Sequence, residues 1–196
     1  VLVDTGFLPL ASILIEPAKI LFLNNAINFG VLAPIGAVEA AETGKSIMFM
    51  LESNPGPGLG LLVAFWLAGP KLLRGSAPGA IVIHFLGGIH EIYFPYVLLK
   101  PIVVLAAIAG GATGVATFAA TGVGLVATPS PGSIFAYMAM TPPGNHFGVL
   151  LGIALSAAVS FVVAFFILKA TRAGGDSADL DASKAQSKAM KTGETA

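Results

Sequence analysis

Residues 147–168 read FGVLLGIALSAAVSFVVAFFIL, a run of 22 residues without a charged side chain. A helix needs roughly 20 apolar residues to cross a hydrocarbon core of about 30 Å, so this run predicts a transmembrane helix. The run closes a longer interval, residues 101–168, that contains no Asp, Glu, Lys or Arg. Residues 101 to about 128 predict a second span. The apolar runs are continuous and do not alternate as in barrel strands, which predicts an all-α integral membrane protein.

Small residues and helix breakers organise this uncharged interval. Gly110 and Gly114 are four residues apart, a spacing that favours close contact between membrane helices. Proline and glycine at 129–132 and again at 141–145 predict breaks in the helices. The piece between the breaks, residues 133–140, is too short to cross a membrane. It is either a surface loop or part of a re-entrant element.

The front half of the chain consists of shorter apolar pieces separated by charged, proline and glycine residues. The pieces are residues 1–15, 20–37, 46–51, 59–68 and 76–90. Such interruption predicts broken helices and re-entrant hairpins. Irregular backbone at membrane depth is tolerated where protein or a water-filled cavity satisfies its polar groups. In transporters, these places often hold the substrate.

Composition supports membrane insertion and excludes several classes of function. The chain is 56% hydrophobic and 10% charged, against about 25% charged residues in soluble domains. The formal net charge of zero indicates no nucleic-acid partner. The absence of cysteine excludes a thiolate metal site and a cysteine nucleophile within the chain. No zinc-protease, phosphate-loop or dinucleotide motif is present, so we expect neither a metal nor a cofactor.

The last 28 residues differ sharply from the rest. Residues 169–196 are rich in charged and small side chains and contain no aromatic residue, which predicts a flexible linker or tail. Lys169 and Arg172 follow the last span directly and place this end in the cytoplasm. We therefore expect a membrane domain at residues 1–168, followed by a cytoplasmic linker. Because the chain opens on Val1 in the middle of an apolar pattern, we expect it to be part of a longer membrane domain.

The densest group of candidate functional residues is GGIHEIYFPY, residues 87–96. A carboxylate close to the membrane core is costly and therefore points to function, which makes Glu91 the principal candidate. The two glycines before it permit a tight turn or close approach of a ligand. Pro95 prevents a continuous helix through the motif. Glu91 either lines a cavity at this turn or lies solvated at the membrane surface.

The second group is FLNNAINFG, residues 22–30. Asn24, Asn25 and Asn28 are flanked by apolar residues, and buried amides need hydrogen-bonding partners. Asn24 and Asn28 share a face if the segment is helical. Amides donate and accept hydrogen bonds, which suits the hydroxyl groups of a polyol. The alternative is an asparagine-rich cap or loop at the membrane surface.

Other polar residues favour structural roles. Glu52, at the start of ESNPGPG, fits a structural turn, and His84 fits a packed histidine in an apolar run. Glu39, Glu42 and Lys45 fit a solvated helical turn.

Long motifs in this chain resemble those of mannitol-specific enzyme IIC, the membrane permease component of the bacterial phosphotransferase system. The resemblance rests on GGIHEIYFPYVLLKP (residues 87–101), EPAKILFLNNAINFG (16–30), AAETGKSIMFMLESNPGPGLGLL (40–62) and SAPGAIVIHFLGGIHE (76–91). These motifs occur in order, and the resemblance covers residues 1 to about 170.

The resemblance implies uptake of mannitol across the bacterial cytoplasmic membrane, coupled to its phosphorylation to mannitol 1-phosphate. In this family the phosphoryl group passes from phosphohistidines to a cysteine of IIB and then to the sugar, so the implied partners are phosphorylated IIB and IIA, with mannitol as substrate. The complete system is a protein-N(pi)-phosphohistidine–sugar phosphotransferase. Glu91 would bind substrate hydroxyls and assist catalysis, Asn24, Asn25 and Asn28 would line the site, and His90 would be a weaker contact. Family members are expected to be homodimers surrounded by membrane lipid.

The chain departs from the family pattern at one candidate site position. Phe29 stands before Gly30 where the resemblance leads us to expect histidine, which affects binding or specificity if that histidine contacts the sugar. Three alternatives stay open: a permease of the same system for another hexitol or sugar, an ion-coupled transporter or channel, and a truncated non-functional fragment.

Overall fold

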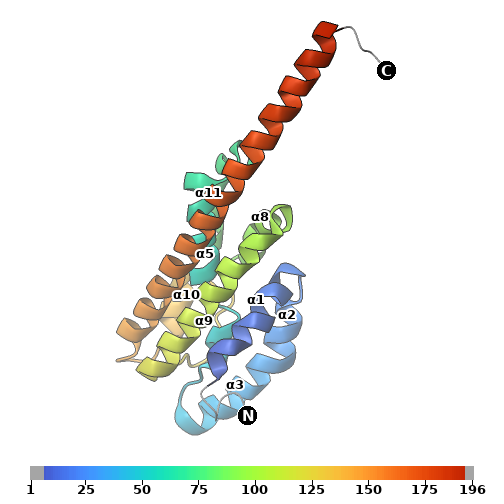
Figure 1. Ribbon diagram of the computed structural model, residues 1–196. Coiled ribbons are helices and arrows are strands. Elements are labelled where there is room, and N and C mark those ends of the chain that lie inside the picture. Colours follow the sequence, from blue (N-terminus) through green and yellow to red (C-terminus); the bar gives the residue numbers. More distant parts are fainter. Residues whose placement is uncertain (1–6, 193–196) are drawn as a thin grey trace.

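The computed structural model describes the backbone of residues 7–192 and the side chains of residues 7–171. The regular structure in this described part is helical, apart from one isolated β-bridge between Ser46 and Leu125 (Figure 1). Two short segments, η2 and η3, are π-helices, and η1, η4 and η5 are 3₁₀-helices. In chain order the elements are η1 (Leu8–Ala11), α1 (Ser12–Ile20), α2 (Asn24–Ile27), η2 (Asn28–Leu32), α3 (Ala33–Thr43), α4 (Met48–Leu51), α5 (Gly56–Ala68), α6 (Lys71–Arg74), α7 (Ala77–Ile81), η3 (Val82–Leu86), η4 (His90–Tyr93), α8 (Phe94–Leu99), η5 (Pro101–Val103), α9 (Val104–Thr121), α10 (Ile134–Met140) and α11 (His146–Thr192).

Helices α5 and α9 pack against each other and against the first part of α11, and the three form the framework of the molecule (Figure 1). Their contact depends on small residues. A Cβ atom at Gly110 would lie 2.7 Å from the Ser156 carbonyl oxygen and 2.7 Å from the Ser160 Cβ of α11. Gly114 faces Asn54 and Ser156 in the same way. The predicted close contact at Gly110 and Gly114 is therefore confirmed.

Two helical stretches are long and apolar enough to cross a membrane. They are Pro101–Thr121, with mean hydropathy 2.0, and His146–Thr171, with mean hydropathy 2.6. The first ends earlier than the predicted limit near residue 128, because Gly122 adopts a left-handed conformation with φ of 63° and caps α9. The backbone of α11 stays helical as far as Thr192. The division of the chain at residue 168 into membrane domain and linker stays a prediction.

The piece at residues 133–140 is a short helix and not a surface loop. The Ser133 hydroxyl accepts a hydrogen bond from the Ala136 amide and so caps α10. The Tyr137 side chain is fully buried, and its hydroxyl lies 2.9 Å from the Ser53 hydroxyl. This contact places α10 against the segment that follows α4.

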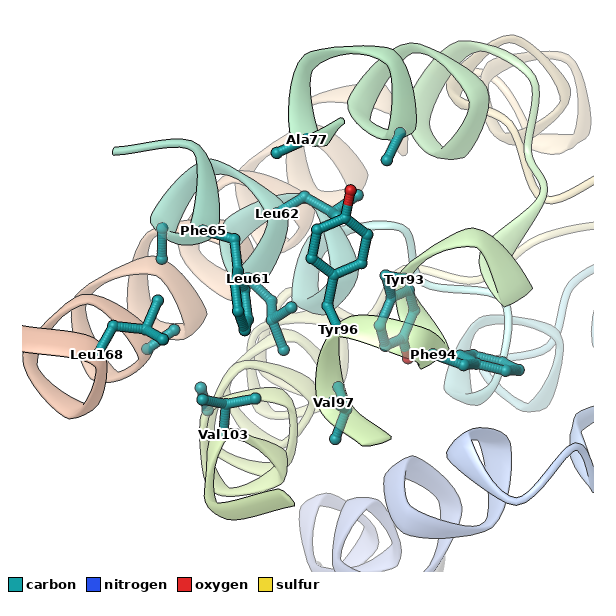
Figure 2. Close-up of a cluster of buried hydrophobic side chains, with 14 of the residues drawn as sticks. Leu61, Leu62, Phe65, Ala77, Tyr93, Phe94, Tyr96, Val97, Val103 and Leu168 are labelled. Atoms are coloured by element: carbon teal, nitrogen blue, oxygen red, sulfur yellow. The ribbon is translucent and has the colours of Figure 1, made fainter. Parts of the chain in front are cut away.

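The largest apolar cluster joins α5, α7, α8, η5 and the middle of α11 (Figure 2). Leu61, Leu62 and Phe65 of α5 are fully buried within it, beside Tyr93 and Phe94. Figure 2 shows these side chains between the helical segments. The cluster fixes the turn at residues 90–94 against the long helices.

Many large apolar side chains lie on the outside of the molecule. Leu14 is 73% exposed, Phe147 is 78% exposed and Phe166 is 67% exposed. Apolar surface on this scale marks contact with a membrane or with other protein surfaces. It is consistent with the two membrane-length helices.

Candidate functional site

A polar pocket of about 120 Å³ lies between the interrupted segments at residues 12–32 and 77–94. One water needs only about 10–15 Å³ of such volume, so the pocket has room for a small polar molecule. Its wall combines the two motifs singled out from the sequence with a loop between α9 and α10. The lining residues are Asn24, Asn25, Asn28, Phe29, Glu52, Ser53, Gly88, His90, Glu91 and Pro129, Ser130, Pro131 and Gly132.

The two sequence motifs meet at a direct hydrogen bond. The Asn24 side-chain amide donates to Oε1 of Glu91 over 2.7 Å, although the two residues are 67 positions apart in the chain. A hydrogen bond to an ionised carboxylate is stronger than one between neutral groups. It fixes one oxygen of Glu91 at the wall of the pocket.

The asparagine segment has an irregular backbone that turns its amides toward the pocket. Phe22 has a positive φ of 61°, so α1 and α2 are separated by a sharp break. Asn24 begins α2, and Asn28 begins the π-helix η2. Both are buried and line the pocket, as expected of residues four apart on one helical face. Asn25 also lines the pocket but is exposed.

The GGIHE segment, residues 87–91, forms a tight turn that requires glycine at position 88. Gly88 has φ of 77°, and a Cβ there would collide with the backbone of Gly132 and Ser133. The predicted turn at these glycines is therefore confirmed. His90 Nε2 lies 3.1 Å from the Gly132 carbonyl oxygen. One ring nitrogen of His90 thus holds the loop that closes the pocket.

Glu52 belongs to the pocket wall, although its sequence context favoured a structural turn. It is 6% exposed and follows α4, next to Ser53, which also lines the pocket. The signal available in the sequence was a carboxylate next to a proline- and glycine-rich stretch in apolar surroundings. Nothing in the sequence placed residues 129–132 beside the two motifs.

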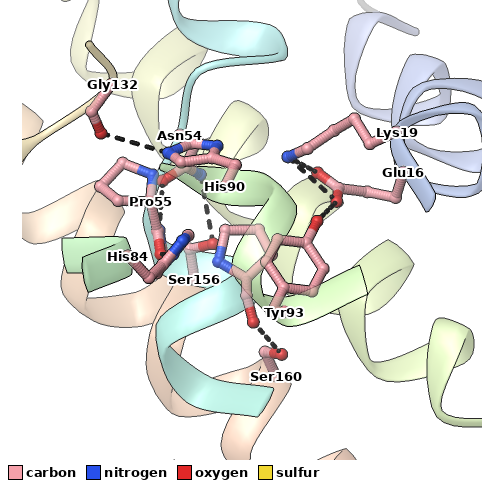
Figure 3. Close-up of polar contacts among 12 residues, drawn as sticks. Glu16, Lys19, Asn54, Pro55, His84, His90, Tyr93, Gly132, Ser156 and Ser160 are labelled. Atoms are coloured by element: carbon pink, nitrogen blue, oxygen red, sulfur yellow. Dashed lines mark hydrogen bonds and ion pairs between the residues drawn. The ribbon is translucent and has the colours of Figure 1, made fainter. Parts of the chain in front are cut away.

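His84 lies behind the pocket wall and is a buried packing residue, as its sequence context predicted. Its ring is fully buried, and Nε2 lies 2.9 Å from the Pro55 carbonyl oxygen (Figure 3). The centroids of the His84 and His90 rings are 4.6 Å apart. Within the described residues, no three His, Asp or Glu side chains gather in a way that could hold a metal ion.

Serine side chains of α11 hold the backbone that follows Glu52. Asn54 Nδ2 donates to the Ser156 hydroxyl over 3.2 Å, and the Gly56 amide donates to the Asn54 side-chain oxygen over 2.9 Å. The Ser160 hydroxyl donates to the Pro57 carbonyl over 2.7 Å. Figure 3 shows Ser156 and Ser160 beside this stretch. The pocket is thus anchored to the long helices through buried hydrogen bonds.

Glu39, Glu42 and Lys45 lie away from the pocket. Glu42 is exposed at the end of α3, whereas Glu39 accepts a hydrogen bond from the Ser46 hydroxyl over 2.6 Å. Lys45 Nζ donates to the Gly122 carbonyl over 2.7 Å and to the Asn145 side chain over 2.8 Å. The expected solvated turn is therefore correct for Glu42, while Glu39 and Lys45 form specific contacts.

The fold and the site together define a helical membrane protein with a polar, hydrogen-bonding pocket. Residues 6–111 match the family described as phosphotransferase system, EIIC. The chain belongs to this family, which is integral to the bacterial cytoplasmic membrane. The family predicted from the sequence motifs is confirmed.

Curated relatives agree with this assignment. The chain is 64% identical over 171 residues to the PTS system mannitol-specific EIICB component of Geobacillus stearothermophilus, covering 87% of this chain and 36% of that protein. It is 56% identical over 191 residues to the component of the same name from Bacillus subtilis, covering 97% of this chain and 40% of that protein.

A third relative is the PTS system mannitol-specific cryptic EIICB component of Escherichia coli K12, 57% identical over 168 residues, which cover 86% of this chain and 36% of that protein. The chain thus spans well under half the length of the curated relatives it matches. No solved structure matches the chain.

Proposed function

We propose that this chain forms part of a permease that takes up mannitol across the bacterial cytoplasmic membrane and holds it for phosphorylation to mannitol 1-phosphate. The observation that carries the proposal is the pocket in which Asn24 donates to Glu91. Relatives that share more than half of the aligned residues are named as mannitol-specific components.

The chemistry of the pocket wall suits a polyol. An ionised carboxylate accepts hydrogen bonds from two neighbouring hydroxyl groups, and an amide both donates and accepts. Glu91 and Glu52 supply carboxylates, and Asn25 and Asn28 supply amides beside them. Such a wall binds adjacent hydroxyl groups, while Phe29 and two prolines supply its apolar part.

Glu91 is the residue to which we assign the catalytic role. As the oxygen of the terminal mannitol hydroxyl attacks phosphorus, the P–S bond to the IIB cysteine breaks, and the hydroxyl proton passes to the Glu91 carboxylate. General-base assistance of this kind is secondary to positioning in phosphoryl transfer. This chain contains no cysteine, so the phosphorylated group belongs to IIB residues outside it.

We further propose a topology in which residues 1–168 lie in the membrane and residues 169–196 lead to a cytoplasmic partner domain. The interruptions at residues 21–23, 28–32 and 82–89 support re-entrant elements, because helix breaks in transporters gather around the substrate. The two cations after the last apolar run, Lys169 and Arg172, support a cytoplasmic C-terminus. We expect a homodimer to be the functional form.

The test is transport by a chimeric permease in which residues 1–171 replace the aligned stretch of the G. stearothermophilus protein. In cells that lack their own mannitol permease, we expect uptake of radiolabelled mannitol and accumulation of its phosphate. Glu91→Ala should lower mannitol binding at least about a hundredfold, because it removes a charged hydrogen-bonding partner. Glu42→Ala, an exposed carboxylate of α3, is the matched control and should leave binding unchanged.

Other transport results would change the assigned substrate or mechanism. Uptake of glucitol without mannitol would assign the pocket to another hexitol. Uptake of unmodified mannitol without phosphoenolpyruvate would replace the phosphotransferase mechanism with ion-coupled transport. Absence of any transport, with the parent protein active in the same cells, would support a non-functional fragment.

A further inference from the structure

A second polar cluster lies beside the pocket without lining it. Glu16 and Lys19 of α1 are both 0% exposed, and Lys19 Nζ lies 3.3 Å from each carboxylate oxygen of Glu16 (Figure 3). The Tyr93 hydroxyl donates to Oε2 of Glu16 over 3.3 Å. Removing two charges from water costs several kcal/mol per ion. A buried pair of this kind therefore calls for an explanation beyond stability.

The cluster connects the same two segments that build the pocket. Lys19 precedes Asn24 by five residues, and Tyr93 follows Glu91 by two residues on the turn η4. Two side-chain hydrogen bonds thus join the segments, one from Asn24 to Glu91 and one from Tyr93 to Glu16, in addition to an edge-on contact between aromatic rings. Two separated hydrogen bonds restrict relative sliding and rotation of the segments more than either bond alone.

The long helices leave space for this cluster. A Cβ at Gly111 of α9 would lie 2.9 Å from Oε1 of Glu16, so the glycine leaves the room that the carboxylate fills. Lys19 Nζ lies 5.9 Å from the centre of the Tyr93 ring, within the range of a cation–π contact. The ring itself is fully buried in the largest apolar cluster, where it contacts Phe94 edge-on. Tyr93 is therefore fixed on one side by the apolar cluster and on the other by the ion pair.

We propose that Glu16, Lys19 and Tyr93 act as positioning residues that hold Asn24 and Glu91 at the geometry needed to bind the polyol. The proposal rests on the proposed function, since it concerns the same pocket. None of the three touches the pocket, so each acts through the Asn24–Glu91 contact. Tyr93 provides the link, because its hydroxyl is the group of η4 that reaches α1.

The first test compares two buried tyrosines of the same segment in the chimeric permease. Tyr93→Phe removes the hydroxyl that reaches Glu16, while Tyr96→Phe removes a hydroxyl that lies 2.8 Å from the Ser76 hydroxyl, away from the pocket. We expect Tyr93→Phe to weaken mannitol binding about tenfold, the effect of losing one hydrogen bond to a charged group. Tyr96→Phe should leave binding unchanged. Equal effects of the two variants would overturn the proposal.

A double-mutant cycle separates positioning from a general loss of stability. If Tyr93 acts through the Asn24–Glu91 contact, Tyr93→Phe in an Asn24→Ala background should cause little further loss of binding. Fully additive losses would show that Tyr93 does not act through Asn24. The double variant Glu16→Gln with Lys19→Met keeps an acceptor for Tyr93 and removes both charges. It should bind mannitol more tightly than Tyr93→Phe, and weaker binding would overturn the hydrogen-bond basis of the proposal.

A measurement without mannitol distinguishes failure of this proposal from failure of the proposed function. Leu21 and Ile89 are exposed, and this chain has no cysteine, so a pair of spin labels can be attached there once the cysteines in the rest of the chimeric permease are replaced by serine. Tyr93→Phe should broaden the distribution of distances between the labels, and Tyr96→Phe should not. A broadened distribution without mannitol binding in any variant would keep the positioning role and reject the substrate. An unchanged distribution in Tyr93→Phe would reject the positioning role.

Discussion

The framework helices α5, α9 and α11 differ from the interrupted segments at residues 12–32 and 77–94 in how their backbones are arranged. The framework helices are regular and pack closely, with glycine at Gly60 and Gly110 under the neighbouring backbone. The interrupted segments contain two π-helices, a 3₁₀ turn and Phe22 at a positive φ. Such irregular elements often occur at functional sites.

The two regions also use polar residues differently. Buried hydroxyls of the framework, such as those of Ser156 and Ser160, serve the protein itself by bonding to residues 54–57. Several polar side chains of the interrupted segments, among them Asn28 and Glu91, line the pocket together with Glu52 from the segment after α4. The comparison teaches that the framework holds the pocket in place and the interrupted segments supply its chemistry. The two contributions can therefore be broken separately.

The largest effect should come from disrupting the framework at Gly110. In Gly110→Leu, the new side chain would begin 2.7 Å from the backbone of α11 and would force the helices apart. Overpacking at so tight a contact should cost about 3 kcal/mol or more. We expect loss of the monodisperse, detergent-purified protein, measured by size-exclusion chromatography and thermal unfolding.

The matched control for this prediction is Gly79→Leu in α7. A Cβ at Gly79 meets nothing within 4 Å, so this variant should fold normally. If Gly110→Leu proved as stable as Gly79→Leu, the close helix contact would not be what holds the framework together.

A smaller effect should follow from loosening the connection between the framework and the pocket. Ser160→Ala removes the hydrogen bond to the buried Pro57 carbonyl, which should lower the free energy of unfolding by about 1–2 kcal/mol. Pro57 lies five residues after Glu52, which lines the pocket. We therefore also expect about threefold weaker mannitol binding, a smaller loss than removal of a whole hydrogen bond to the ligand would cause. Thermal unfolding and ligand titration on one preparation measure both.

Thr113→Ala provides the comparison for this variant. The Thr113 hydroxyl donates a hydrogen bond to the Ala109 carbonyl of its own helix. Its removal therefore breaks no connection between the framework and the pocket. Binding that falls in Thr113→Ala as much as in Ser160→Ala would contradict a specific link between α11 and the pocket.

The framework could be predicted from the sequence far better than the pocket. Continuous apolar runs identify α9 and α11, because helix formation in lipid depends on local composition, and the spacing of Gly110 and Gly114 indicates a close helix contact. The sequence does not predict the third framework helix, α5, since residues 59–68 group with the interrupted pieces. The sequence predicts a longer span than α9, because the residues after Gly122 stay apolar. There, hydropathy alone does not reveal a backbone reversal.

The pocket required contacts between residues far apart in the chain. The sequence identified Glu91, His90 and the three asparagines as separate motifs, and the structure brings all five to one pocket. No feature of the sequence placed residues 129–132 at the pocket, since a Pro-Ser-Pro-Gly stretch is typical of any loop. The bond between Tyr93 and Glu16 joins positions 77 apart. No local pattern predicts such a bond.

The smallest expected effect concerns Phe29, which lies on the pocket wall and is 55% exposed. In Phe29→His, an imidazole would replace an apolar ring beside Asn28 and could form a hydrogen bond with a polyol hydroxyl. One neutral hydrogen bond corresponds to about three- to tenfold tighter binding of mannitol. Phe29→Leu, which stays apolar, should bind like the parent chain in the same titration. Because more than half of the Phe29 side chain is exposed, thermal unfolding should be unchanged in both variants. Tighter binding confined to Phe29→His would show that the interrupted segments tune the ligand independently of the framework, and equal or weaker binding would remove Phe29 from the residues that set affinity.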